Sequence, residues 1–357
     1  KTTIGDIADL YKGTGISKDQ LSDDGEPCIL YGELYTKYKS ETIREVISKT
    51  NIDNTKLVRS KANDVIIPCS GETAEDIATA RCVLNGNILL GGDLNIIRLH
   101  GYDGAFMSYQ LNGRRKYDIA KVAQGVSVVH LYGEHLKGVK TINPCLEEQK
   151  KIAKLLSLLD ERIVTQNKII DKLQSLIKGL RVGLMQIENG NIVHLGEIAQ
   201  IYQPQTISST ELTEDGFLVY GANGIIGKYK QYNHKTEQIC ITCRGNTCGM
   251  VNYTKPMSWI TGNAMVINTD EHQNKVCKRY LYHYLSAYNF NSLISGSGQP
   301  QIVRTPLEQL KVTLPTFLEQ KQKATFLDKI QGKIEICNKA LNLYLQQKQY
   351  LLRQMFI

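Results

Sequence analysis

Near its start the chain reads Ile4-Gly5-Asp6-Ile7-Ala8-Asp9-Leu10-Tyr11, and in its second half it reads Leu195-Gly196-Glu197-Ile198-Ala199-Gln200-Ile201-Tyr202. The two strings are related by an offset of 191 residues. Further along, Pro144 corresponds to Pro315 at an offset of 171, so the second copy is shorter through loop deletions. Self-similarity on this scale indicates two homologous halves.

Each half ends in a segment with a sustained heptad pattern. The first segment opens at Leu146-Glu147-Glu148-Gln149-Lys150 and the second at Leu318-Glu319-Gln320-Lys321. Apolar residues then recur in alternating steps of four and three, with Gln166 and Lys348 as polar members, which is the pattern of a coiled-coil seam. The first seam comprises Ile152, Leu156, Leu159, Ile163, Ile170, Leu173, Ile177, Leu180 and Leu184. The second comprises Leu327, Ile330, Ile334, Cys337, Leu341, Tyr344, Leu351 and Met355.

These seams predict two long helices that pack against each other. Proline precedes each segment and is absent inside it, as expected at a helix boundary. The stretch 152–184 rises roughly 50 Å as a helix, which exceeds what one globular half needs for its core. A single helix of this kind would be read more simply as packing on its own domain. Two matched seams favour an antiparallel coiled coil that separates the halves and gives the monomer approximate two-fold symmetry.

The globular halves have a mixed α/β pattern. Runs rich in β-branched residues predict strands at 65–67, 94–99, 238–243 and 264–267, and helical patterns cover 275–288 and 106–111. We therefore expect two homologous α/β domains at 1–145 and 191–316, with the long helices at 146–190 and 317–357.

The composition is that of an ordinary globular protein, and its positive net charge favours a polyanionic partner. The 357 residues are 42% hydrophobic and 22% charged, with a net charge of +8, which favours nucleic acid without proving it. No long apolar run or secretory signal is apparent, so we expect a cytoplasmic protein. Its nine cysteines are then expected to be reduced.

Two sequence patterns resemble ligand sites but fit them poorly. The run Gly221-Ala222-Asn223-Gly224-Ile225-Ile226-Gly227-Lys228 has its glycines one residue too far apart for a phosphate loop, and Tyr229 replaces the metal-binding hydroxyl. Cys240, Cys243 and Cys248, with His234 or Cys277, suggest zinc. However, an odd separation on a strand sends Cys240 and Cys243 to opposite faces, which favours buried thiols and no metal.

No catalytic motif is recognisable. Asn143-Pro144-Cys145-Leu146 resembles an amino-methyltransferase motif, but it lacks the aromatic residue that would stack on a flipped base. No glycine-rich cofactor loop, nucleophile elbow or His-Glu-x-x-His motif is present. We expect no catalytic residues, cofactor or metal on this chain.

The remaining polar chemistry suits DNA, because Arg and Lys bind phosphates while Arg, Asn and Gln pair with base edges. The loop Arg244-Gly245-Asn246-Thr247 ranks first, since it follows a predicted strand directly and its glycine allows close approach. Any single residue of this kind is more often a solvated surface side chain. The candidates in the second half are Lys228, Lys230, Arg244, Asn246, Gln299, Gln301 and Arg304. Those in the first half are Arg81, Arg114, Arg115, Lys116 and Gln124.

Two homologous modules, each ending in a Leu-Glu-Gln-Lys type string and a heptad helix, resemble the DNA-specificity subunit of type I restriction-modification systems. Three strings look like segments of its target-recognition domains: Gly71-Glu72-Thr73-Ala74-Glu75-Asp76-Ile77, Tyr220-Gly221-Ala222-Asn223-Gly224-Ile225-Ile226-Gly227 and Gly296-Ser297-Gly298-Gln299-Pro300-Gln301-Ile302. The resemblance covers essentially the whole chain. The first half departs at Pro68-Cys69-Ser70-Gly71-Glu72-Thr73, which is acidic where the second half has Arg244-Gly245-Asn246-Thr247, so the halves should read different sequences.

The resemblance implies a non-catalytic subunit in which each module reads one half of a split double-stranded DNA target. The helices would space the modules and dock two modification subunits, which bind S-adenosylmethionine and methylate adenine. Restriction subunits, where present, would supply ATP- and Mg-dependent translocation and cleavage. Two alternatives stay open: the specificity part of a type II-like system, and a coiled-coil scaffold that does not bind DNA.

Overall fold

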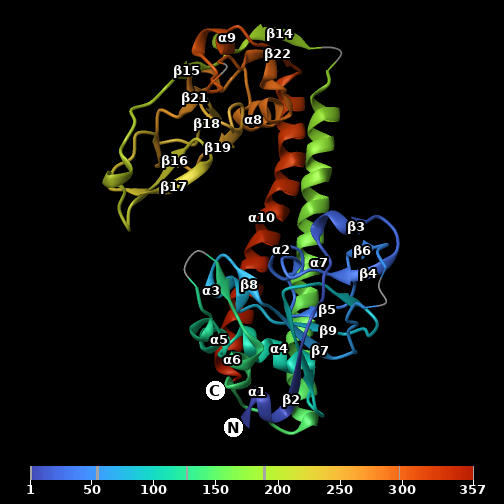
Figure 1. Cartoon of the computed structure of the whole chain (residues 1–357). Coiled ribbons are helices and arrows are strands. Elements are labelled where there is room, and N and C mark those ends of the chain that lie inside the picture. The colour runs from blue at the N-terminus through green and yellow to red at the C-terminus, as the bar shows by residue number, and fades with distance from the viewer. Residues whose placement is uncertain (1, 54–55, 126–127, 188–189, 297, 357) are drawn as a thin grey trace. The chain divides into compact units, whose positions relative to one another are not determined.

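The computed structural model describes residues 2–53, 56–125, 128–187, 190–296 and 298–356. The chain forms two compact units, one of residues 1–168 with 339–357 and one of residues 169–338. The boundary crosses both long helices, α7 (Leu146–Met185) and α10 (Phe317–Gln354), so each unit owns one globular module and part of each helix (Figure 1).

The first unit is built on a five-stranded sheet in the order β2-β11-β7-β9-β5 and a four-stranded sheet in the order β10-β4-β6-β3. The strands of the two sheets alternate along the chain, and the sheets share a hydrophobic cluster. The strands of the larger sheet are β2 (Ala8–Lys12), β11 (Leu94–Leu99), β7 (Asp64–Pro68), β9 (Arg81–Val83) and β5 (Thr42–Ile43). Those of the smaller sheet are β10 (Leu89–Leu90), β4 (Glu26–Ile29), β6 (Ser48–Thr50) and β3 (Leu21–Ser22).

Short pairs and helices complete this unit. Strand β1 (Thr2–Thr3) pairs with β13 (Lys140–Thr141), and β8 (Ser70–Gly71) pairs with β12 (Val129–His130). The helices are α1 (Ile4–Ile7), α2 (Glu33–Thr36), α3 (Ala74–Ile77), α4 (Gly104–Asn112), α5 (Lys116–Val122) and α6 (Gly133–Lys137), with a 3-10 turn η1 at Lys18–Gln20.

The second unit repeats this topology with fewer strands. Its sheets run β15-β21-β18-β19 and β17-β16-β20, and β14 pairs with β22. The strands are β14 (Asn191–His194), β15 (Gln200–Tyr202), β16 (Phe217–Gly221), β17 (Gly224–Tyr229), β18 (Ile239–Thr242), β19 (Val251–Tyr253), β20 (Trp259–Ile260), β21 (Ala264–Asn268) and β22 (Lys311–Leu314). The helices are α8 (Lys278–Ala287) and α9 (Arg304–Glu308), with 3-10 turns η2 (Leu195–Glu197), η3 (Ser209–Glu211), η4 (Asp270–His272) and η5 (Phe290–Leu293).

The strand order makes the duplication explicit. Strands β2, β11, β7 and β9 occupy the places of β15, β21, β18 and β19, and in each smaller sheet one parallel pair occurs, β10 with β4 and β20 with β16. Apolar residues alternate between two clusters across the central strands: Ile66 packs in one cluster, while Val65 and Ile67 pack in another. The predicted strands and the predicted helices at 106–111 and 275–288 are all present, and the mixed α/β class is confirmed.

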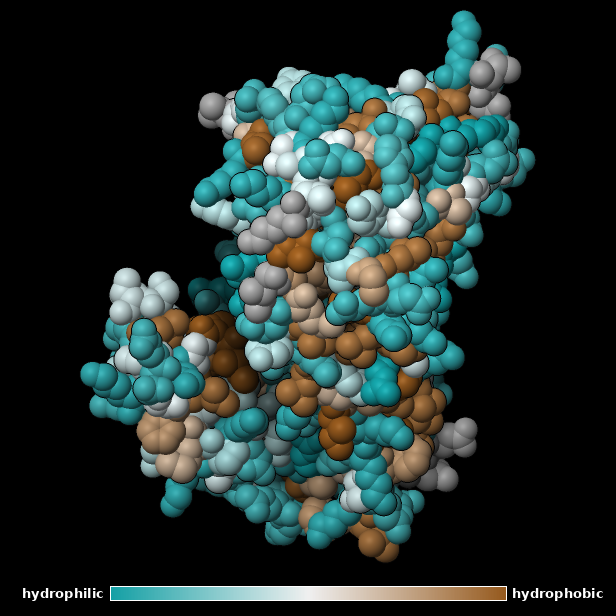
Figure 2. All heavy atoms as spheres, turned by 90° about the horizontal axis from the view of Figure 1, so that it is seen from below, coloured by the Kyte–Doolittle hydropathy of each residue, from teal (hydrophilic) through white to brown (hydrophobic). Residues whose placement is uncertain are grey.

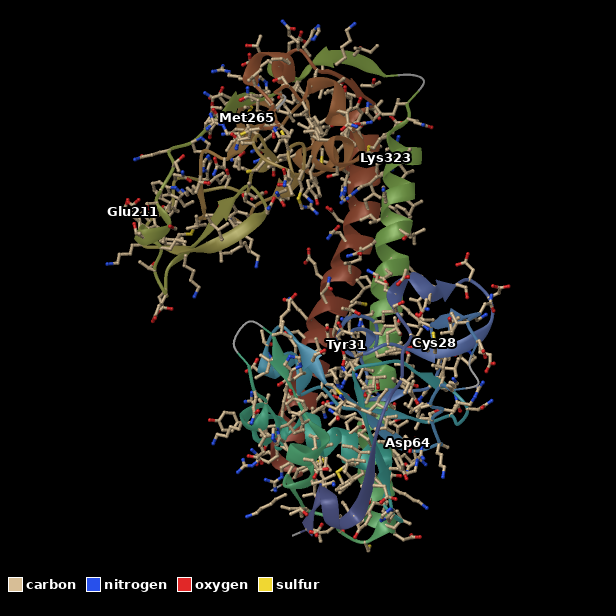
Figure 3. All side chains as sticks on the ribbon, in the orientation of Figure 1. Cys28, Tyr31, Asp64, Glu211, Met265 and Lys323 are labelled. Carbon is tan, nitrogen blue, oxygen red and sulfur yellow. The ribbon has the colours of Figure 1, made fainter. Side chains whose placement is uncertain are left out.

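The two long helices run antiparallel in each unit. In the first, Ala153 and Leu156 near the start of α7 share a cluster with Leu352 and Phe356 at the end of α10. In the second, Lys323 near the start of α10 donates to the carbonyl of Leu184 at 2.7 Å (Figure 3). Every residue of both seams is buried or half-buried.

The seam residues also join the cores of the modules. Ile177, Leu327 and Ile334 lie in the same cluster as strands of the second module, and Leu156 packs with Phe106 and Tyr109 of α4. The helices therefore pack on each other, as the coiled-coil interpretation predicts. They also pack on their own modules, as the simpler interpretation of a single helix predicts. Among the described residues, no helix has the length and apolar character needed to cross a membrane.

The glutamine of the Leu-Glu-Gln-Lys string explains why this string recurs. Gln149 and Gln320 are each 1% exposed. The Gln149 side chain donates to the carbonyl of Pro144 at 2.7 Å and accepts from the backbone N–H of Asp103 at 3.0 Å. Gln320 repeats this arrangement, with donation to Pro315 at 3.0 Å and acceptance from the N–H of Cys277 at 2.9 Å. Each glutamine thus ties the start of a long helix to the start of α4 or α8.

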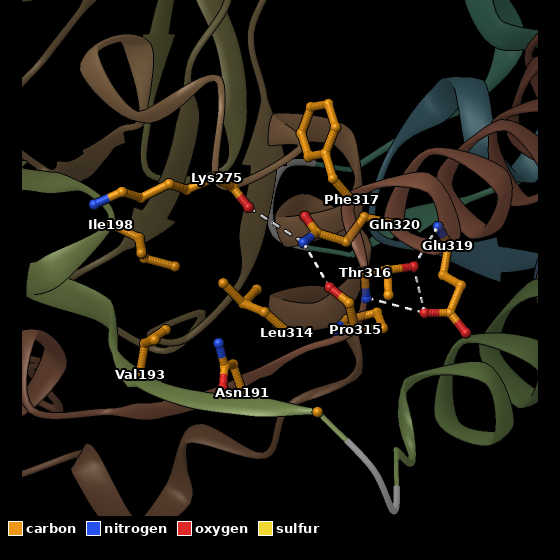
Figure 4. Close-up of a pocket in the computed structure, with 11 residues that line it drawn as sticks. Asn191, Val193, Ile198, Lys275, Leu314, Pro315, Thr316, Phe317, Glu319 and Gln320 are labelled. Atoms are coloured by element: carbon orange, nitrogen blue, oxygen red, sulfur yellow. Dashed lines mark hydrogen bonds between the residues drawn. The ribbon is translucent and has the colours of Figure 1, made fainter.

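A cavity of about 540 Å³ borders this junction in the second unit. Figure 4 shows Gln320 between Lys275 and Pro315, with Glu319 accepting from both the backbone and the hydroxyl of Thr316. Thr316, Glu319 and Gln320, which line the cavity, make contacts that fix the start of α10. We assign it to the architecture of the helix junction.

Candidate nucleic-acid interface

Three segments of the second module converge beyond the end of β18. The backbone at Arg244 bridges to Gln301, the N–H of Gly245 donates to the carbonyl of Pro300 at 3.0 Å, and the N–H of Ile302 donates to Cys243 at 3.0 Å. These bonds place the Arg244 loop beside the 299–301 segment, although more than fifty residues separate them in sequence.

The turn between β16 and β17 joins the same group. The Thr247 hydroxyl donates to the Asn223 side chain, and the Thr242 hydroxyl donates to the carbonyl of Ala222. We call residues 222–223, 244–247 and 299–301 the second loop cluster. Ser297, part of the predicted string 296–302, lies outside the described residues.

Four of the predicted DNA-binding residues lie in the second loop cluster: Arg244, Asn246, Gln299 and Gln301. All four are exposed, and among the described residues no side-chain hydrogen bond or ion pair engages them. They offer a guanidinium fork and three amides, the groups that pair bidentately with guanine and adenine. The turn at 222–223 contributes a further exposed amide, Asn223, which the sequence prediction did not include.

The other three predicted residues of this module lie elsewhere. Lys228 and Lys230 are at the far end of the β16–β17 hairpin from its turn, and Lys228 lies 3.7 Å from the Asp215 carboxylate. Arg304 opens α9 and pairs with Glu308 at 2.7 Å. These three cations do not form part of the second loop cluster.

In the first module the predicted residues are dispersed. Arg114 is exposed and Arg115 half-buried between α4 and α5, where the Arg115 guanidinium contacts Asp118 at 3.2 Å. Lys116 begins α5, and Gln124 follows its end. The backbone of Gln124 exchanges two hydrogen bonds with His130, at 2.9 and 2.7 Å. His130 was not predicted, since a lone histidine in sequence carries no signal.

Arg81 lies inside the first module. It is 8% exposed, and its guanidinium donates to the carbonyl of Tyr38 at 3.2 and 3.0 Å and to that of Ala80 at 3.1 Å. Burial lowers the pKa of Arg81, and the nearby Glu41 carboxylate opposes that shift. In this conformation the guanidinium is occupied by contacts within the fold.

A buried ionic cluster joins the first module to both long helices. Lys348 of α10 lies 2.6 Å from Asp160 of α7 and 2.5 Å from Glu41 of the module, and the Tyr109 hydroxyl donates to Asp160 at 2.8 Å. Burial raises the pKa of Glu41. Burial opposes the charged form of Lys348, but the two carboxylates raise its pKa overall. The polar break in the second seam is thus an anchor for the module.

The second unit has a different anchor. Asp328 of α10 accepts from Arg279 and, at 2.8 Å, from Nε2 of His283, both on α8. The Nε of Arg181 on α7 donates to Nδ1 of His283 at 3.1 Å, so that ring is neutral with its proton on Nε2. Burial lowers the pKa of His283. Although burial opposes it, donation from His283 and Arg279 holds the pKa of Asp328 below its ordinary value.

The cysteines are distributed as the strand pattern predicts. Cys240 packs in a cluster with Tyr220, while Cys243 packs in the main core of the second unit. Burial raises the pKa of the Cys240 thiol. Within the described ranges, no group of three or more His, Cys, Asp or Glu side chains has the arrangement of a metal site.

Comparison with known proteins identifies the architecture. The family model described as "Type I restriction modification DNA specificity domain" matches residues 1–175 and 188–345. The chain is 32% identical to the type I restriction enzyme EcoprrI specificity subunit of Escherichia coli, over 38% of this chain and 34% of that one. It is 25% identical to the MjaVIII specificity subunit of Methanocaldococcus jannaschii, over 94% of this chain and 87% of that one.

Two solved structures share the fold. The S subunit of a type I restriction-modification system from M. genitalium superposes with a TM-score of 0.71 at 19% identity, covering 99% of this chain and 95% of that one. A chain from a structure that describes complex assembly of the type I R-M system gives 0.56 at 15% identity, covering 98% and 95%.

Proposed function

Because the chain belongs to the type I restriction modification DNA specificity domain family, we propose that it is the specificity subunit of a type I restriction-modification complex. Each module reads one half of a bipartite duplex target, and the long helices set the distance between the half-sites. The observation that carries this proposal is the second loop cluster, where four separately predicted base-reading side chains come together on one exposed edge.

The domains in this proposal follow the sequence boundaries, with recognition modules at 1–145 and 191–316 and spacer helices at 146–190 and 317–357. The spacer scale is adequate. At 1.5 Å per residue, the 40 residues of α7 extend about 60 Å, which exceeds one turn of duplex DNA at roughly 34 Å.

The long helices also supply the docking surface for two modification subunits. Away from its seam, α10 exposes Ile336, Leu343 and Tyr350 at successive heptad positions, with exposed fractions of 68%, 63% and 64%. Helix α7 exposes Leu155, Ile169 and Leu176 on one heptad-related line, with Arg162 at the position between the first two. On the face drawn in Figure 2, exposed apolar side chains lie among hydrophilic ones. The seam of each long helix is covered by the other helix and by a module, whereas this second apolar stripe is exposed. An exposed apolar stripe of this kind is typical of a surface that binds another protein.

In this proposal the chain itself is non-catalytic, carries no cofactor and acts in the cytoplasm. S-adenosylmethionine, ATP and Mg belong to the modification and restriction subunits. The absence of a recognisable catalytic motif in the sequence supports this division of labour.

Co-expression with the modification subunits of the same operon tests the proposal. We expect methylation of adenines within a bipartite motif when the genome is sequenced for modified bases. Duplex binding by the purified complex should weaken steeply with salt, because the contacts with phosphates release counterions. Salt-insensitive behaviour without a methylated motif would instead favour the coiled-coil scaffold. The copurifying subunits distinguish a type I from a type II-like system.

A further inference from the structure

The first module repeats the backbone bonds that join residues 243–245 to residues 295–302 in the second. Beyond β7, the carbonyl of Cys69 accepts from the N–H of Leu131 at 2.7 Å, as Cys243 accepts from Ile302 at 3.0 Å beyond β18. Ser70 pairs with His130 in the β8–β12 ladder, as Arg244 pairs with Gln301. Ser70 therefore stands in the place of Arg244.

The partner hairpins are equivalent too. The backbones of Ser295 and Gln301 exchange two hydrogen bonds, both of 2.8 Å, like those between Gln124 and His130. Each hairpin has a glycine next, with φ of +125° at Gly125 and +95° at Gly296. A Cβ there would meet the carbonyl three residues later at 2.1 and 2.5 Å, so both turns need glycine. His130 therefore stands in the place of Gln301.

The side chains on this shared frame have different chemistry. The first module places Glu72 two residues after Ser70, where the second has Asn246, and adds Glu75 and Asp76 in the following helix. Glu72 is exposed, and no hydrogen bond or ion pair to it occurs within the described part of the chain. We call residues 70–73 with 124 and 130 the first loop cluster.

The backbone holds these side chains in place. The Thr73 hydroxyl accepts from the N–H of Asp76 at 3.1 Å and caps α3, which fixes the chain immediately after Glu72. The exposed ring of His130 stacks on Tyr132, with centroids 6.2 Å apart and planes 22° apart. The backbone on both sides of Glu72 and the ring of His130 are thus held before binding, which reduces the freedom lost on binding.

Resting on the proposed function, we propose that Glu72 and His130 determine the specificity of the first module, with Glu72 accepting from the amino group of a cytosine in the major groove. A carboxylate is repelled by phosphates, so a carboxylate that lies in a DNA interface binds favourably where it faces a donor on a base edge. Glu and Asp accept from cytosine N4, whereas Arg pairs with guanine. His130 contacts a base beside that cytosine from the paired strand.

The test uses the full chain assembled with its modification subunits. Binding is measured to duplex libraries in which the first half-site is randomised and the second is held fixed. For Glu72→Gln we expect the preference at one position to move from cytosine toward adenine, with a ratio change of about 5- to 150-fold. For His130→Ala we expect weaker discrimination at a neighbouring position. Asp23→Asn is the matched control, since Asp23 is an exposed acid in the turn between β3 and β4.

Unchanged first half-site letters for both Glu72→Gln and His130→Ala, in complexes that still read the second half-site, would overturn the assignment. Unchanged letters at the second half-site also confirm that each variant is folded and assembled. If His130→Ala fails to assemble, His130→Gln places the residue type of Gln301 on the same hairpin and should alter the same position. A wild-type complex without any bipartite preference would defeat the proposed function itself, which separates that failure from failure of this inference.

Discussion

The starts of the two long helices and the two loop clusters show opposite behaviour between the halves. At the helix starts, Gln149 and Gln320 make the same pair of hydrogen bonds in the same surroundings. In the loop clusters the backbone pairing of 70 with 130 is repeated between 244 and 301, but exposed Glu72 and His130 stand where Asn246 and Gln301 stand. Groups that hold the frame are buried and repeated, whereas groups that face solvent differ. A buried polar group must keep its hydrogen-bond partner in the protein, because water cannot replace that partner. The residue type is therefore most restricted at buried positions such as Gln149 and Gln320.

The largest effect should come from the ionic anchor of the first unit. Lys348→Met removes the ammonium group that pairs with the buried carboxylates of both Glu41 and Asp160. We expect a loss of about 3–5 kcal/mol in unfolding free energy, measured by denaturant titration. Lys339→Met, at an exposed position of α10, is the control and should change stability little. Equal stability of the two variants would show that the polar break in the seam is not an anchor.

The two glutamines provide a direct test of structural equivalence. Gln149→Leu and Gln320→Leu each leave a backbone N–H and a proline carbonyl without a partner, at a cost of about 1–3 kcal/mol apiece. We expect similar losses for both in thermal and denaturant unfolding, with Gln322→Leu on the exposed side of α10 as the control. A large loss for one and none for the other would break the equivalence of the helix starts.

The loop clusters should show modular effects on recognition. Arg244→Ala removes a guanidinium from the second loop cluster, so we expect discrimination at one position of the second half-site to fall by about 1–3 kcal/mol. The first half-site should keep its letters, as read from the methylated motif. Lys311→Ala, which removes an exposed cation of β22 that is not among the predicted DNA-binding residues, is the control. Equal loss at both half-sites would contradict separate reading by the two modules.

The smallest effect is a pH dependence of the free energy of unfolding. It is expected for the second unit, whose anchor contains His283, and it has no histidine counterpart in the ionic anchor of the first unit. Burial lowers the pKa of His283 and of His234, both in the second unit. Because the unfolded chain binds more protons below pH 6.5, stability is complete above that pH and falls as the pH drops toward the lowered folded pKa. The slope is at most about 1.4 kcal/mol per pH unit for each histidine.

Hydrogen exchange at pH 7 and pH 5.5 measures this loss locally. Protection in the second unit should decrease, and His283→Gln should reduce the pH dependence while leaving the part due to His234. A pH dependence identical to wild type in His283→Gln would show that the ring does not titrate between the folded and unfolded states.

Much of the architecture is legible in local patterns. The offset strings, the prolines and the heptad seams predict two homologous halves and two long helices, because these features depend on periodicity within a segment. The strands at β7, β11, β18 and β21 follow from runs of β-branched residues for the same reason. The sequence predicts the four side chains of the second loop cluster one by one as DNA-binding candidates. Nothing in their spacing indicates that residues 244 and 301 lie side by side.

Tertiary packing settles what each polar residue does. Arg81 and Arg244 are similar in sequence, since each is a lone arginine near a strand end. One has its guanidinium bound to the carbonyl of Tyr38 inside the first module, while the other is exposed beside Gln301. Lys348 interrupts an apolar seam and acquires its role only from Glu41, which is three hundred residues away. Periodicity is a property of neighbouring residues and can be read along the chain, whereas burial and hydrogen-bond partnership depend on segments that only folding brings together.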